Sequence, residues 1–167
     1  MIPGQEPTRL GGLPGWRNVP AQRKAGSRLS TPLSQSFFVP GPLPGLNDFI
    51  AWAKKRGVTV GKKGAMWNDY NAQKRSWEDM IISVIHTSRL TPVAVPVTIS
   101  YLWQEPNKRR DYSNIAAGKK LVEDALVRAG ILRGDGWRDI TGFTDRFEIN
   151  RKQPGVRVTL MPDKIER

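Results

Sequence analysis

Two aspartates, Asp111 and Asp135, flank a predicted helix inside a strongly basic stretch of the chain. Three consecutive cations, Lys108, Arg109 and Arg110, directly precede Asp111, and a short glycine-rich loop carries Asp135. Carboxylates in a cationic patch oppose the binding of a polyanion, and the usual reason for them is a divalent metal that bridges carboxylate and phosphate oxygens. Two simpler explanations compete with a metal site, because the helix dipole favours Asp111 at a helix N-terminus and aspartate is common in turns.

The stretch between the two aspartates has the pattern of one amphipathic helix that covers about residues 114–129. Ser113 or Asn114 can cap its N-terminus through a side-chain oxygen, and Gly130 suits a left-handed exit. Lys120 stands four residues before Asp124, a spacing that allows an ion pair on the helix surface. The three- and four-residue spacing of apolar and small residues predicts one packed face, made of Ile115, Gly118, Val122, Ala125, Leu126 and Ala129.

The same stretch resembles the signature of the RusA-like Holliday junction resolvases, small crossover-junction endonucleases of phages and prophages. That signature is a basic run, Asp-x-Asp-Asn, a helix lysine, Asp-Ala-Leu, Ala-Gly and a final Asp in a Gly- or Asp-rich loop. This chain has the same order in Arg109-Arg110-Asp111-Tyr112-Ser113-Asn114, Lys120, Asp124-Ala125-Leu126, Ala129-Gly130 and Asp135. One branch of the family also looks similar at Trp137, Gly142-Phe143 and Asp145-Arg146-Phe147, so the likeness covers about residues 36–161. One position departs from the pattern, because Ser113 replaces the second acid of Asp-x-Asp.

The resemblance implies a metal-dependent, structure-selective endonuclease that resolves four-way junctions or other branched DNA by phosphodiester hydrolysis. Asp111 and Asp135 would be catalytic ligands of Mg²⁺, with Mn²⁺ as the alternative ion and Ser113 and Asn114 as further candidate ligands. Lys120 would neutralise charge that develops on the phosphate. The loss of one acid supports an alternative, a protein that binds junctions without cutting them. A third hypothesis, independent of the resemblance, is a generic basic RNA- or DNA-binding protein.

The composition agrees with a nucleic-acid-binding protein. The 167 residues carry a net charge of +12 and give a pI near 10.5, and such a field attracts nucleic acid or an anionic membrane surface. We expect no membrane partner, no small-molecule cofactor and no signal peptide, and the absence of cysteine excludes thiolate metal sites. The expected location is the cytoplasm of a bacterial host, with the protein bacterial or phage-encoded. The candidate phosphate contacts are Lys62, Lys63, Lys108, Arg109 and Arg110.

The expected fold is one α+β domain at residues 36–161, a RusA-like mixed or antiparallel sheet of about four strands packed by three helices. Residues 1–35 are rich in glycine and proline and predict a flexible basic tail, and residues 162–167 form a short C-terminal tail. The predicted strands are 35–39, 95–103, 138–149 and 156–161, the last two paired as an antiparallel hairpin. The predicted helices are about 47–54, 66–89 and 114–129.

The resemblance also implies a homodimer. A helix over residues 114–129 would be about 24 Å long at 1.5 Å per residue, which separates the two acids that flank it. Antiparallel pairing of this helix with its copy would bring Asp111 of one chain near Asp135 of the other and would give two equivalent sites. The small residues that would allow this approach, or that pack within one chain instead, are Ala116, Ala117, Gly118 and Ala125.

Overall fold

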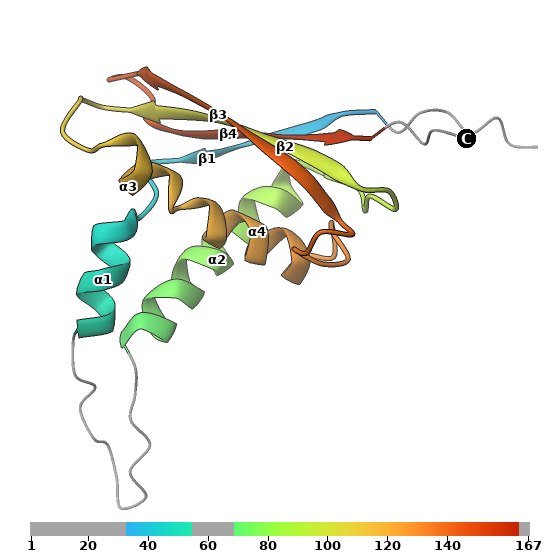
Figure 1. Ribbon diagram of the computed structural model, residues 1–167, viewed down its shortest axis with the longest axis horizontal. Coiled ribbons are helices and arrows are strands. Elements are labelled where there is room, and N and C mark those ends of the chain that lie inside the picture. Colours follow the sequence, from blue (N-terminus) through green and yellow to red (C-terminus); the bar gives the residue numbers. More distant parts are fainter. Residues whose placement is uncertain (1–32, 55–68, 164–167) are drawn as a thin grey trace, which may run out of the picture. The chain divides into compact units, whose positions relative to one another are not determined.

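The computed structural model describes residues 33–54 and 69–163. Its elements follow in the order β1 (Gln35–Pro40), α1 (Leu46–Lys54), α2 (Asp69–Thr87), β2 (Val97–Glu105), α3 (Tyr112–Ala116), α4 (Lys119–Arg128), β3 (Ile140–Ile149) and β4 (Gly155–Pro162) (Figure 1). These elements belong to one compact unit with a four-stranded mixed sheet, which confirms the predicted α+β class. Residues 1–32 of the predicted tail, the predicted start of the second helix, and Lys62 and Lys63 lie outside the described residues.

The sheet has the strand order β1-β4-β2-β3. β4 is antiparallel to both β1 and β2, whereas β2 and β3 are parallel. The predicted hairpin of the last two strands is therefore wrong, because β2 lies between them. Parallel neighbours need a long crossover connection, which α3 and α4 provide between β2 and β3. Alternating apolar residues identify β3 and β4 as strands, but this alternation does not determine which strand each one pairs with.

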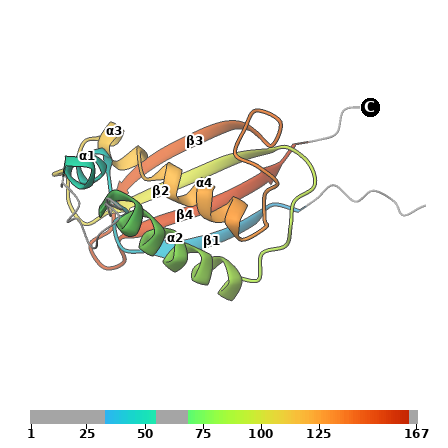
Figure 2. The ribbon, with the colours of Figure 1, turned by 90° about the horizontal axis from the view of Figure 1, so that it is seen from below.

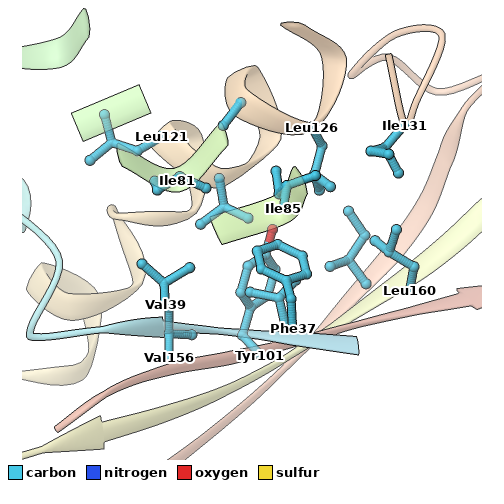
Figure 3. Packing of buried hydrophobic residues seen from close by; sticks show 14 of the residues in the cluster. Phe37, Val39, Ile81, Ile85, Tyr101, Leu121, Leu126, Ile131, Val156 and Leu160 are labelled. Atoms are coloured by element: carbon cyan, nitrogen blue, oxygen red, sulfur yellow. The ribbon is translucent and has the colours of Figure 1, made fainter. Parts of the chain in front are cut away.

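The helices lie on one side of the sheet, where the core forms (Figures 1 and 2). β2 alternates buried and half-buried residues along its whole length, so one of its faces is packed and the other is more open. Figure 3 shows strand side chains Phe37, Val39, Tyr101, Val156 and Leu160 beside Ile81 and Ile85 of α2 and Leu121 and Leu126 of α4. Burial of these apolar side chains is the main force that holds the helices on the sheet. In the described part of the chain, no helix is long and apolar enough to cross a membrane.

The helix predicted over residues 114–129 is divided into α3 and α4. The break falls where the chain passes close to the segment that precedes α1. A Cβ added to Gly118 would lie 3.1 Å from the Pro44 carbonyl oxygen and 3.2 Å from the Leu43 Cβ. Glycine thus allows this close approach, a long-range contact that helical spacing alone does not reveal.

The predicted cap at the start of the helix differs from the observed one, whereas the predicted left-handed exit at its end agrees with the structure. Asp111 caps α3, because its Oδ1 accepts a hydrogen bond of 2.7 Å from the Asn114 backbone N–H. The prediction of a cap at Ser113 or Asn114 is therefore wrong. The predicted left-handed exit is confirmed, since Gly130 has a φ of +72°.

Gly155→Ala is expected to weaken the pairing of β1 with β4. Gly155 lies opposite Pro40, and an added Cβ would overlap the Val39 carbonyl oxygen and the Phe38 ring. Overpacking of this kind costs about 1–3 kcal/mol, so the urea midpoint of unfolding should fall. Gly142→Ala in β3 is the matched control, because a Cβ there meets nothing within 4 Å. Equal midpoints for the two variants would contradict this account of the β1–β4 contact.

Candidate functional site

A buried ion pair closes the loop that follows β2. The Glu105 side chain is 8% exposed, and Arg110 approaches it with Nε at 3.1 Å from Oε2 and Nη2 at 2.5 Å from Oε1. Arg110 Nη1 also donates to the Leu43 carbonyl oxygen at 2.7 Å. Three hydrogen bonds therefore tie the Arg110 guanidinium to Glu105 and Leu43. The exposed cations of the basic run are Lys108 and Arg109.

Asp111 follows this ion pair and lies at the rim of a hollow of about 520 Å³. One of its oxygens caps α3, and the residue itself is exposed. Tyr112 stacks on Phe147 of β3 with ring centroids 4.5 Å apart, and both side chains line the same hollow. Lys108 also lines it, so a carboxylate, an ammonium group and a pair of aromatic rings share one concave surface. The other lining residues are Glu105, Asn107, Arg110, Ile115, Glu148 and Ile149.

The two further candidate ligands, Ser113 and Asn114, have different surroundings. Ser113 is exposed on α3. Asn114 is 6% exposed, and its Oδ1 accepts a hydrogen bond of 3.0 Å from the Asn47 backbone N–H. This hydrogen bond connects α3 to α1. The Asn114 amide oxygen, which was a candidate metal ligand, thus accepts a hydrogen bond within the fold.

Asp135 lies in a second hollow, of about 250 Å³, between α2 and α4. Lys120 Nζ lies 2.6 Å from an Asp135 oxygen and 2.8 Å from an Asp124 oxygen. Lys74 of α2 lies 2.6 Å from the other Asp124 oxygen. Two lysines and two aspartates thus form a chain of ion pairs, and Glu78 extends it at 3.2 Å from Lys74.

The electrostatics of this cluster keep Lys120 protonated. Hydrogen bonds to Asp124 and Asp135 raise the pKa of the Lys120 ammonium group. The hydrogen bond from Lys120 lowers the pKa of the Asp135 carboxyl, so both partners stay charged near neutral pH. Partial burial raises the pKa of the neighbouring Glu123 carboxyl. The cluster therefore holds a protonated Lys120 ammonium group between the Asp124 and Asp135 carboxylates.

The structure brings Lys120 and Asp135 together but leaves Asp111 in a different hollow. Within residues 33–54 and 69–163, no group of three or more histidine, cysteine, aspartate or glutamate side chains is placed to hold a metal ion. Asp111 has one oxygen engaged at the helix cap, and Asp135 is held by Lys120. The two aspartates predicted to bind Mg²⁺ therefore line different hollows of one chain.

The small-residue side of the divided helix is used within the chain. Ala125 is fully buried in the core, and Gly118 is buried against the segment before α1. Packing of these small residues within one chain was the alternative to their use in pairing the helix with its copy across a dimer axis. It leaves the intermediate Ala116 and Ala117 as the more accessible members of that side.

Sequence reasoning missed two residues that organise these hollows, Glu105 and Lys74. Glu105 occupies a buried position in the alternation of β2, and an acid at such a position indicates a cationic partner. Lys74 stands four residues before Glu78, a spacing that predicts their contact but not the contact of Lys74 with α4. Asp124, whose spacing from Lys120 predicted an ion pair, lies between both lysines.

Comparison with protein-family models gives no match, and no curated protein matches the chain significantly in sequence. The resemblance to the RusA-like resolvases therefore depends only on the order of the motif residues in the sequence, within about residues 36–161.

Arg110→Ala is expected to destabilise the fold strongly. The variant leaves the buried Glu105 carboxylate and the Leu43 carbonyl without their partner, and loss of one member of a buried pair costs about 3 kcal/mol or more. Arg109→Ala is the matched control, because Arg109 is exposed in the same run. Chemical unfolding followed by circular dichroism measures both variants. Equal free energies of unfolding would show that the Arg110–Glu105 pair does not hold the loop.

Proposed function

We propose that this protein acts on branched DNA as a RusA-like, structure-selective endonuclease, with four-way junctions as its preferred substrate. The observation that carries the proposal is the hollow at the end of β2, where Asp111, Lys108 and the Tyr112–Phe147 stack meet. A net charge of +12 favours association with DNA at this and other surfaces. The order of motif residues from Arg109 to Asp135 supports the nuclease class.

Cations and an aromatic ring in and beside the hollow suit a DNA strand at a branch point. The exposed Lys108 and Arg109 can bind phosphates, and the exposed Tyr112 ring can stack on an unpaired base. Branched DNA offers such bases more readily than linear duplex does, because base stacking is interrupted at the branch. The proposed selectivity for branches therefore depends on the aromatic pair, and the affinity depends on the cations.

A second candidate function, a junction-binding protein that does not cut, is favoured by the positions of the carboxylates. Asp124 and Asp135 are neutralised by lysines, Asp111 lies apart from them, and Ser113 occupies the place of an acid. We therefore assign no catalytic step to a metal ion within one chain. Incubation of junction DNA with the protein and Mg²⁺, beside a gel-shift assay in EDTA, separates the two candidates. Cleavage supports the nuclease, and branch-selective binding without cleavage supports the binding protein.

If the protein cuts junctions, Asp111→Asn is expected to abolish cleavage while junction binding persists or tightens. The change removes a carboxylate from the hollow and also removes a charge that repels phosphate. Asp135→Asn should have the same effect, because Asp135 is the second acid to which the resemblance gives a role in the reaction. Asp79→Asn is the control, since it makes the same charge change at an exposed position of α2. Near wild-type turnover in either of the first two variants would exclude that aspartate from the cleavage reaction.

Binding is expected to weaken steeply as salt rises, with Lys108 and Arg109 among the contributors. Each lost phosphate contact should lower the slope of log affinity against log salt by about 1. Lys108→Ala is compared with Arg133→Ala, whose side chain pairs with Asp139 in the loop before β3. Fluorescence anisotropy with a labelled junction at several salt concentrations gives the slopes. Identical slopes for the two variants would exclude Lys108 as a phosphate contact.

A further inference from the structure

One face of the sheet has no helix of the described chain on it. The helices α1–α4 lie on the other side of the sheet in both ribbon views (Figures 1 and 2). The β2 residues that face away from the helices, Thr98, Ser100, Leu102 and Gln104, are half-buried and alternate with fully buried ones. A hollow of about 720 Å³ is lined by side chains of this face from β2, β3 and β4. The described chain thus leaves a concave sheet face uncovered.

The strand pairing places two arginines in one row across this face. Phe38 of β1 lies opposite Arg157 of β4. Leu102 of β2 is the pairing partner of both Arg157 and Arg146 of β3, so it lies between the two arginines. Neighbouring strands are about 4.8 Å apart, which places the backbones of the two arginines about 10 Å from each other. Both arginines are exposed, and among the described residues neither has a carboxylate partner.

The neighbouring row across the sheet consists of hydroxyl side chains. In order from β1 to β3 it contains Ser36, Thr159, Ser100 and Thr144. Hydroxyl groups donate and accept hydrogen bonds, and serine, threonine and arginine are among the residues that bind the phosphates and sugars of nucleic acids. We call the arginine row and the hydroxyl row together the open face.

The Phe38 ring supports the Arg157 guanidinium. The guanidinium carbon lies 5.7 Å from the ring centroid, which is a cation–π contact. This contact holds the guanidinium against the sheet, and arginine guanidinium planes are surfaces on which nucleic-acid bases stack. Leu102 and Met161 are half-buried and line the same hollow, where they offer apolar contacts to a base. The open face therefore combines cations, hydroxyls and apolar side chains.

The charges on and around the open face favour an anionic occupant. Two acids flank it, and both accept hydrogen bonds from neighbouring side chains, Glu148 from the Gln104 amide and Asp163 from the Thr98 hydroxyl. The two arginines thus lie between acids that already have partners. An uncharged protein segment would cover the arginines without pairing them, which is costly. A nucleic-acid strand would pair them, and the net charge of +12 attracts it.

We propose that the open face binds a single strand of nucleic acid. Arg146 and the hydroxyl row contact its phosphates and sugars, and Arg157 stacks on a base, with Leu102 and Met161 in apolar contact with the bases. A cationic surface with stacking groups is the arrangement that binds single strands without sequence preference. A duplex suits the face less well, because its bases are already stacked on each other and are not free to stack on Arg157.

The open face extends beyond the proposed function, since its ligand is unbranched and its binding requires no cleavage. The hollow on this face and the hollow at Asp111 have Phe147 and Glu148 in common, so the two hollows adjoin at β3. A single strand that leaves a branch point at Asp111 can therefore continue around the edge strand onto the open face.

Isotope-labelled methionine methyl groups test where a single strand lies, with oligothymidylate as the probe and without Mg²⁺. Its addition should shift the methyl signal of Met161, which lines the hollow on the open face. The methyl signal of Met80, in α2 on the helix side of the sheet, should stay in place. Met161→Leu assigns the first signal. A Met161 signal that does not move, or equal shifts at both methionines, would overturn the proposal.

Affinities for labelled oligothymidylate, measured by fluorescence anisotropy, test the two arginines. Arg157→Ala should weaken binding about fivefold or more, since one stacked base is lost. Arg157→Lys should lose most of the same affinity, because it keeps the charge but lacks the planar guanidinium. Arg146→Ala should lower the slope of log affinity against log salt by about 0.7. Arg75→Ala, the same charge change at an exposed position of α2, is the control and should bind like the wild type.

Circular dichroism verifies that each variant is folded. A wild-type chain that does not bind oligothymidylate, or an Arg157→Ala variant that binds as Arg75→Ala does, would overturn the proposal. Wild-type affinity of Arg157→Lys would overturn stacking on Arg157. Sedimentation velocity without DNA provides a further check, because loss of self-association in the arginine variants with unchanged affinity would assign the open face to a second copy instead. Failure of any of these tests leaves the junction assays of the proposed function to be judged separately.

Discussion

The buried carboxylate of Glu105 is the constraint on which the arrangement around Asp111 depends. A carboxylate at an almost fully buried strand position needs a cationic partner, because desolvation without one is very costly. Arg110 fulfils this need and also binds the Leu43 carbonyl, so the end of β2 is tied to the segment before α1. The chain between these two residues must close a short loop that presents Lys108 and Arg109. Asp111 then starts α3 at a fixed distance from the sheet.

Local patterns predicted much of this fold, because the strands and helices have a clear periodicity of their own. The alternation of Ile99, Tyr101 and Trp103 identified β2, and the spacing of Val122, Ala125 and Leu126 identified the packed face of α4. The insertion of β2 between β3 and β4 was not predictable in this way. Strand order depends on contacts between distant segments, and the break near Gly118 likewise reflects its contact with the segment before α1.

The candidate site likewise depends both on contacts between residues close in the sequence and on contacts between distant segments. The cap formed by Asp111 and the pair of Lys120 with Asp124 involve residues three or four apart, so the sequence contains their signals. The approach of Lys120 to Asp135 depends on how the loop after α4 folds back. The ion pair between Arg110 and Glu105 depends on which face of β2 is buried. A residue that resembles a phosphate-binding arginine can therefore be committed to the fold.

The most direct test of the account is chemical-shift mapping of the isotope-labelled protein with a four-way junction and with a linear duplex of the same sequence. The account predicts that the junction perturbs the amide signals of residues 107–112 strongly and more than the duplex does. Equal shifts with both DNAs, or junction-induced shifts confined to segments away from Asp111, would contradict the proposal that this hollow recognises branched DNA.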